Sequence, residues 1–300
     1  MKLTRIITPG LFAFATAALL VPHSARAQSI SYSAGDLVLG FEDYSSSSVT
    51  GTADYLVDLG PASYFTGLSG GTVVNLTTSD PAHDGQSQVG LGNLATDLAT
   101  AFNTSNGAPW YTDGTLGNNV QWGIIGATPK TTGEFGLSKA TIFLTTPEET
   151  PGQGAETIPT TGSVSQQQSW DGNVLNLTAP GNGFGNVPST SNNAYGAFES
   201  NSLTDSWSSE IVNNSDFGTG FNIEQPLDGS NFGPTNSQLD LYELVPNASS
   251  ATELGTLTLD SSGDLVYTAA VPEPSTYATV ALGAAFLVMF RRRLGSRIVA

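Results

Sequence analysis

The stretch LGTLTLDSSGDLVYTA, residues 254–269, decides the fold class. Apolar and polar residues alternate on both sides of Asp260-Ser261-Ser262-Gly263, so each half places its apolar side chains on one face of a strand. A short polar connection that contains glycine suits a turn between antiparallel strands. The stretch therefore predicts a β-hairpin with strands at 255–259 and 264–269.

The rest of the body repeats this pattern of short apolar runs between residues that favour turns. One segment differs, because Leu91, Leu94, Ala95, Leu98 and Phe102 recur at helical spacing. We expect an amphipathic helix over 91–103 that packs its apolar stripe on a sheet. The predicted fold is all-β, a jelly-roll-like β-sandwich with this one packed helix. The other predicted strands are 36–41, 53–59, 72–77, 120–126, 140–145, 174–178 and 239–244.

Residues 28–270 form one exported β-rich domain in this interpretation. Two stretches rich in Pro, Gly, Ser, Thr, Asn and Gln, near 146–168 and 179–202, are expected to be long surface loops. Phe184, Tyr195 and Phe198 would tether the second loop. A division into two domains near residue 150 is the alternative.

The N-terminus has the three parts of a secretory signal peptide. Lys2 and Arg5 precede an apolar run at 11–21, and Ala25-Arg26-Ala27 is a small-x-small cleavage site. Cleavage after Ala27 removes residues 1–27 and makes Gln28 the first residue. An uncleaved membrane helix is the alternative, but the apolar run is too short to span a bilayer. The chain therefore requires signal peptidase and the export machinery.

The C-terminus contains Pro272-Glu273-Pro274, an apolar run from Tyr277 to Phe290 and the cluster Arg291, Arg292 and Arg293. Its 14 apolar residues extend ~21 Å as a helix, against a hydrocarbon core of ~30 Å. A buried core helix or an interfacial segment would also fit that length. The three arginines favour a transmembrane helix that stops with its basic end in the cytoplasm, followed by a cytoplasmic tail at 294–300.

This order of motif, apolar helix and arginine cluster resembles the PEP-CTERM sorting signal of Gram-negative bacteria over Val271 to Arg293. The resemblance implies recognition by a membrane-embedded protease of the exosortase type, which removes the tail and passes the protein to the cell surface or extracellular matrix. The short helix suits a transient anchor. The extension to Ala300 departs from family tails that end close to the basic cluster.

Removal of both ends would leave an acidic body. Seven of the nine Lys and Arg residues lie in the two ends, so residues 28–271 keep only Lys130 and Lys139 against 25 Asp and Glu. Such a body repels nucleic acid and anionic lipid, although many secreted proteins are acidic for solubility alone. The sequence has no cysteine, which excludes disulfides and thiolate metal sites.

No catalytic residue is predicted from a motif. His83 is the only histidine left after residue 27, which excludes a zinc site with several imidazoles, and its polar context indicates a turn. Paired carboxylates of the kind that glycosidases use do not reveal themselves by sequence spacing. A secreted carbohydrate-active enzyme is therefore the alternative to a non-enzymatic surface or matrix protein in an exopolysaccharide-rich biofilm.

Two further features bear on ligands. Trp110 and Tyr111 are candidates for an exposed platform that contacts glycans, whereas Trp122 in an apolar run is expected in the core. No cofactor or metal is expected. Calcium at acidic turns is the alternative, although Asp-Gly pairs are ordinary turn formers and no turn extends to a twelve-residue calcium loop. The candidate calcium ligands are Asp171, Asp228, Asp260 and Asp264.

Overall fold

The computed structural model is mostly β and describes much of the body between the two ends of the chain. The expected signal peptide and the tail after Val271 lie outside the described residues. None of the helices within the described ranges has the length and apolar character needed to cross a membrane. The described residues are 33–45, 48–49, 54–78, 91–102, 119–129, 131, 133, 136–147, 158–167, 195–199, 206–208, 223–227 and 237–271.

Most of the strands expected from alternation are present, and several extend beyond their predicted ends. The predicted hairpin is confirmed as β10 and β11, which pair antiparallel with Leu257 opposite Tyr267. The elements are β1 (Asp36–Ser45), β2 (Ser48–Val49), β3 (Asp54–Pro61), α1 (Ala62–Thr66), β4 (Val73–Asn75), α2 (Leu94–Ala101), β5 (Asn119–Ala127), β6 (Ile142–Pro147), β7 (Gly196–Glu199), β8 (Glu224–Leu227), β9 (Ser237–Leu244), β10 (Thr252–Leu259) and β11 (Leu265–Ala269).

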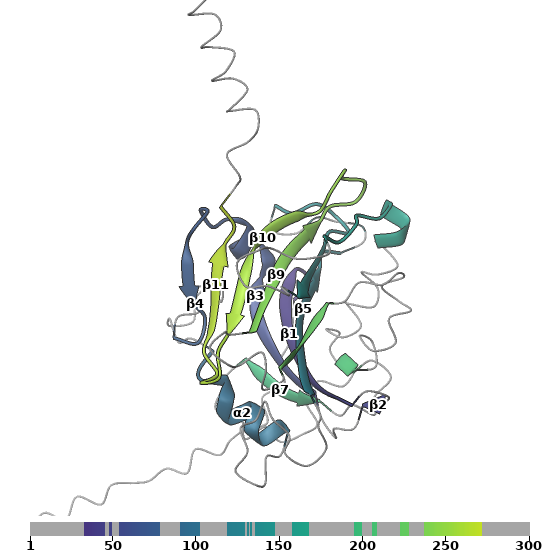
Figure 1. Cartoon of the computed structure of the whole chain (residues 1–300). Helices are drawn as coiled ribbons and strands as arrows, with labels where there is room; N and C mark the ends of the chain where they lie inside the picture. Colours follow the sequence, from purple (N-terminus) through teal and green to yellow (C-terminus); the bar gives the residue numbers. More distant parts are fainter. Residues whose placement is uncertain are drawn as a thin grey trace, which may run out of the picture.

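All described strands belong to one antiparallel sheet in the order β4-β11-β10-β9-β6-β5-β1-β3-β7, with β2 added to β1 and β8 to β5. The all-β prediction is confirmed. The two-layered jelly-roll sandwich is not confirmed, because these strands form a single continuous sheet that curls (Figure 1). Right-handed twist accumulates from strand to strand, so a sheet this wide turns its two ends toward each other.

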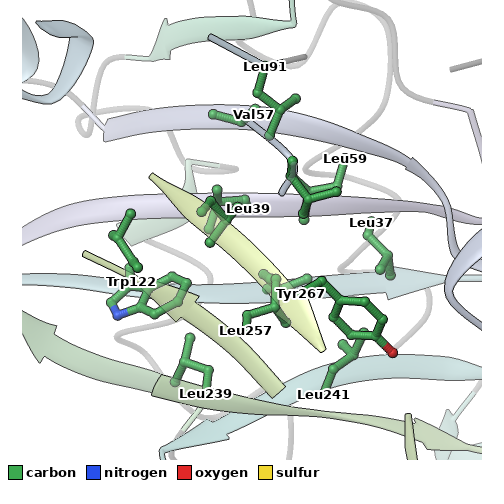
Figure 2. Packing of buried hydrophobic residues seen from close by; sticks show 14 of the residues in the cluster. Leu37, Leu39, Val57, Leu59, Leu91, Trp122, Leu239, Leu241, Leu257 and Tyr267 are labelled. Atoms are coloured by element: carbon green, nitrogen blue, oxygen red, sulfur yellow. The ribbon is translucent and has the colours of Figure 1, made fainter. Parts of the chain in front are cut away.

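The main hydrophobic core fills the inside of this curl. Leu37, Leu39 and Phe41 of β1 lie in one buried cluster with Leu257 of β10 and Tyr267 of β11. Figure 2 shows β10 and β11 crossing over the strands that carry Leu39 and Trp122, with Leu257 and Tyr267 between them. Distant parts of one sheet therefore supply the two walls of the core.

The helix α2 closes one end of the curl and confirms the predicted amphipathic helix, with a start at Leu94 (Figure 1). Leu94 and Leu98 are buried in the main core. Asn93 caps the helix by accepting a hydrogen bond from the Ala95 N–H at 2.9 Å, and its Nδ2 donates to the Ser262 carbonyl at 2.7 Å. The helix is thereby fixed to the β10–β11 turn.

Several short elements escape prediction. β7 falls within the stretch expected to be a loop near 179–202, and it pairs with β3. β8 and α1, of four and five residues, are too brief to show a period. A helical turn at 164–167 falls within the other expected loop, where the Gln167 Nε2 donates to the Leu244 carbonyl. The strand expected at 174–178 lies outside the described residues.

Because the β10–β11 turn packs closely against α2, we expect Gly263→Ala to destabilise the fold strongly. Gly263 has φ of +86°, and a Cβ there would collide with the Ala95 backbone nitrogen. Gly92 has φ of +76° with open space around it, so Gly92→Ala is a matched control that adds only backbone strain. We expect Gly263→Ala to lower the free energy of unfolding by about 2–4 kcal/mol and Gly92→Ala by about 1 kcal/mol. Urea unfolding measures both, and equal losses would contradict the packing.

Candidate functional site

Two glycines lie next to each other in a row of residues that crosses the outer face of the sheet. The register places Gly40 of β1 opposite Leu56 of β3 and Gly123 of β5, and Gly123 opposite Glu224 of β8. A Cβ at Gly40 would collide with the indole of Trp207, and a Cβ at Gly123 would lie 3.1 Å from Cγ of Glu224. The two glycines therefore leave the space that Trp207 and Glu224 occupy.

Residues 206–208, which we call the strap, lie across this row. Trp207 is fully buried and packs in the outer cluster that also contains Val38, Leu56 and Ile125. Its Nε1–H donates a hydrogen bond to Oε1 of Glu224 at 2.7 Å. The strap thus covers the outer face of the sheet at Gly40 and its apolar neighbours.

The next residue of the strap binds a second carboxyl group. The backbone N–H and the hydroxyl of Ser208 each donate to Oδ2 of Asp54 at 2.9 Å. Asp54 has no exposed surface, and its Oδ1 has no hydrogen-bond partner. Burial raises the pKa of Asp54 from 3.8 to about 6, although the hydrogen bonds from Ser208 act to lower it.

A third carboxyl group, that of Glu42, completes the cluster. Phe41 pairs with Tyr55, so the next pair along the two strands brings Glu42 of β1 opposite Asp54 of β3. Glu42 has no exposed surface, and its carboxyl group neighbours that of Glu224. Burial raises the pKa of Glu224 from 4.5 to about 7, and the charge of Asp54 adds to the rise, while the proximity of Glu42 and the hydrogen bond from Trp207 oppose it.

The carboxyl cluster of Glu42, Asp54 and Glu224 has no cation in the described part of the chain to balance it. Lys139 is the only Lys, Arg or His among the residues that the structure describes, and its side chain is exposed. Within the same residues, no group of three His, Cys, Asp or Glu side chains could hold a metal ion. Burial of neighbouring carboxyl groups favours their protonated forms, so the arrangement can hold protons.

The candidate residues named from the sequence are not part of this cluster. Asp260 organises the β10–β11 turn, since its Oδ1 accepts from the Ser262 and Asp264 N–H groups and the Ser262 hydroxyl. Asp264 accepts from the Thr77 hydroxyl at 3.1 Å. Trp122 lies in the core as expected, with its Nε1–H on Ser237. The remaining candidates lie outside the described residues: Ala25, Ala27, Gln28, Trp110, Tyr111, Asp171, Asp228, Pro272, Glu273, Pro274, Arg291, Arg292 and Arg293.

Sequence reasoning allowed for paired carboxylates but did not find these three. Glu42 follows directly after the expected strand 36–41, and Asp54 is the first residue of β3. A carboxyl group at such a position is ordinarily expected to face solvent. Glu224 and Trp207 come from short segments without a period. The unusual signal is a glycine in the middle of each central strand, Gly40 and Gly123, because glycine there marks close approach of another group.

The last strand leads directly into the C-terminal tail. Ala269 and Ala270 still bond to the sheet, through Ala269 N–H to the Thr72 carbonyl at 2.9 Å and Ala270 N–H to the Leu254 carbonyl at 2.8 Å. The Ala269 carbonyl also accepts from the Gly71 N–H. Val271 is 69% exposed. One exposed residue therefore separates the folded sheet from Pro272.

Residues 270–293 match the family model for the PEP-CTERM protein-sorting motif. The tail thus carries a PEP-CTERM sorting motif, as its resemblance predicted. Such motifs target proteins for export and surface anchoring by exosortase in Gram-negative bacteria, and they imply processing by exosortase, a membrane protein. No curated protein and no solved structure matches the chain.

The carboxyl cluster predicts that stability falls as pH rises. A carboxyl group whose pKa is higher in the folded state holds its proton there after the unfolded chain has lost it, so the free energy of unfolding decreases from about pH 4 to about pH 7. Asp54→Asn keeps an acceptor for Ser208 and removes one buried charge. We expect it to raise the free energy of unfolding by about 1–3 kcal/mol at pH 8 and to have little effect at pH 4.

Urea unfolding of the full chain at pH 4 and pH 8 measures this effect. Glu253→Gln, which removes a carboxylate from an exposed position on β10, is the matched control and should leave the pH dependence unchanged. A loss of stability in Asp54→Asn at pH 8 would contradict the charge-burial account of the cluster.

Proposed function

We propose that this chain is a non-enzymatic surface or extracellular-matrix protein that an exosortase-type system delivers. The observation that carries the proposal is the sorting motif at 270–293, which follows the last strand of the folded body directly. Because no long spacer separates the folded domain from the sorting tail, the tail directs the transport of this domain.

The tail holds the body on the outer side of the inner membrane until it is processed. Arg291, Arg292 and Arg293 stay in the cytoplasm because guanidinium groups are costly in hydrocarbon. The apolar run from Tyr277 to Phe290 is short for a permanent membrane helix, which suits an anchor that is later cut. Exosortase then releases the body to the cell surface or matrix.

The body's composition supports a role among uncharged or weakly charged polymers outside the cell. Residues 28–271 carry two lysines against 25 acidic residues, which disfavours nucleic acid and anionic lipid as partners. Trp110 and Tyr111 supply an aromatic platform for the sugar rings of an exopolysaccharide. In a biofilm matrix this contact retains the released protein.

A second candidate function is a carbohydrate-active enzyme, which the carboxyl cluster favours. Glu224, with a pKa of about 7 beside Trp207, has the protonation expected of a general acid. Two features weigh against this function. Glu42 neighbours Glu224 inside the protein, whereas glycosidase carboxyl groups stand about 5–9.5 Å apart with the sugar between them. The cluster is also buried, and Glu42 has no exposed surface.

Neutralising the arginine cluster tests the delivery proposal. We expect replacement of Arg291, Arg292 and Arg293 by Gln to abolish surface delivery, because the tail loses its cytoplasmic stop and its fixed orientation. Arg297→Gln, outside the cluster, is the matched control and should be delivered normally. Fractionation of cells and immunoblotting of the surface fraction measure the outcome. Normal delivery of the triple variant would contradict the proposal.

Glycan binding tests the role of the body. We expect the purified full chain to bind a glycan array of bacterial exopolysaccharides, and Trp110→Ala to weaken binding at least about 10-fold because one stacked ring is lost. Trp110→Phe, which keeps an aromatic face, should retain most of the binding. Sugar release by the chain that Glu224→Gln abolishes would instead support the enzyme.

A further inference from the structure

The strap depends on carboxyl groups for its hold on the sheet. Three hydrogen bonds of 2.7–2.9 Å fix it, one from Trp207 to Glu224 and two from Ser208 to Asp54. Ser206 lies beside Ser208, with 3.5 Å between their hydroxyl oxygens, and all three residues are buried. The carboxyl groups of Glu224 and Asp54 accept these bonds, and each can bind or release a proton. The charge beneath the strap therefore depends on pH.

The titratable groups on the described strands around the strap are acidic. β1 contributes Glu42, β8 contributes Glu224, and β3 contributes Asp54 together with Asp58, which accepts from the Gly60 N–H at 2.8 Å. Glu199 of β7 lies opposite Asp54 in the register. β5 contributes Gly123 and the uncharged Gln121, and the strap itself has no titratable side chain.

Glu42 and Glu224 are neighbouring buried carboxyl groups, which makes the closed state depend on protons. Two buried carboxylates close together repel each other, so the closed state favours a proton on one of the pair. Loss of that proton leaves like charges close together in a buried place, with the charge of Asp54 beside them.

We infer that the strap is an acid-closed latch, which lies on the sheet while the cluster of Glu42, Asp54 and Glu224 holds its protons and lifts off when the cluster loses them. Lifting admits water to the carboxylates and uncovers the indole of Trp207, together with the outer apolar cluster beneath it. The protein thus presents an aromatic and apolar surface in neutral to alkaline surroundings and hides that surface in acidic ones. This inference does not rest on the sorting or glycan proposals.

Two effects compete when the protons leave. The bonds from Trp207 and Ser208 become stronger to ionised acceptors, which favours the closed strap. Burial and mutual repulsion oppose ionisation, and they prevail, because the pKa values of Asp54 and Glu224 are raised to about 6 and about 7. Ionisation therefore costs less in the open state. By linkage, Asp54 alone increases the equilibrium constant for opening about 10-fold between pH 5 and pH 8.

A single introduced thiol tests the latch, because the chain has no cysteine. Ser206→Cys places a buried thiol within the strap itself, and Ser261→Cys, on the exposed β10–β11 turn, reports the intrinsic reactivity at each pH. The ratio of their maleimide-labelling rates in the full chain measures opening. We expect this ratio to rise at least about 10-fold from pH 5 to pH 8.

Two further variants separate the latch from general loosening. Asp54→Asn combined with Glu224→Gln removes the ionisations and should make the Ser206→Cys ratio independent of pH. Gly40→Ala displaces Trp207 and should raise the ratio at every pH. A ratio that stays constant in the parent, or that rises equally in the Asn/Gln variant, would overturn the inference.

Hydrogen exchange of the unmodified full chain gives a test that needs no substitution. After correction for intrinsic exchange rates, the Trp207 and Ser208 amides should exchange faster at pH 8 than at pH 5 relative to the β5 amides. An equal increase in exchange at the strap amides and the β5 amides would indicate global unfolding and would overturn the inference of a local latch.

Discussion

Apolar packing between the hairpin β10–β11 and the strands β1 and β3 holds the sheet in its curl, and the other features follow from this contact. The rings of Tyr267 in β11 and Phe65 in α1, directly after β3, meet edge to face at 5.1 Å. The core inside the curl buries one face of β1, which carries Leu37, Leu39 and Phe41. The alternate residues Val38, Gly40 and Glu42 then face outward, where a second cover is needed. The strap provides that cover.

Much of the local structure was predictable because it depends on neighbours in sequence. Alternation in 254–269 predicted the β10–β11 pair, and the spacing of Leu91, Leu94 and Leu98 predicted α2 and its buried face. The motif at Pro272-Glu273-Pro274 predicted the sorting tail in the same way, from adjacent residues. In each case the information is contained in fewer than thirty consecutive residues.

The curl and the carboxyl cluster were not predictable for a common reason. Glu42, Asp54 and Glu224 meet only after β1 has paired with β3 and β5, and β5 with β8. A shift of any of these registers by one residue would turn a carboxyl group to the other face. Alternation indicates that a strand has an apolar face. It does not show whether that face packs against a second sheet or against another part of the same sheet.

The junction between β11 and the tail has a mechanical consequence. Ala269 is bonded to Thr72 and Gly71 on one side, Ala270 to Leu254 on the other, and Val271 alone separates these residues from Pro272. A pulling force applied at Pro272 reaches the hydrogen bonds of β11 with β10 and β4 after a single exposed residue. Any load on the tail is therefore a load on the core hairpin, and a body without a tail does not carry it.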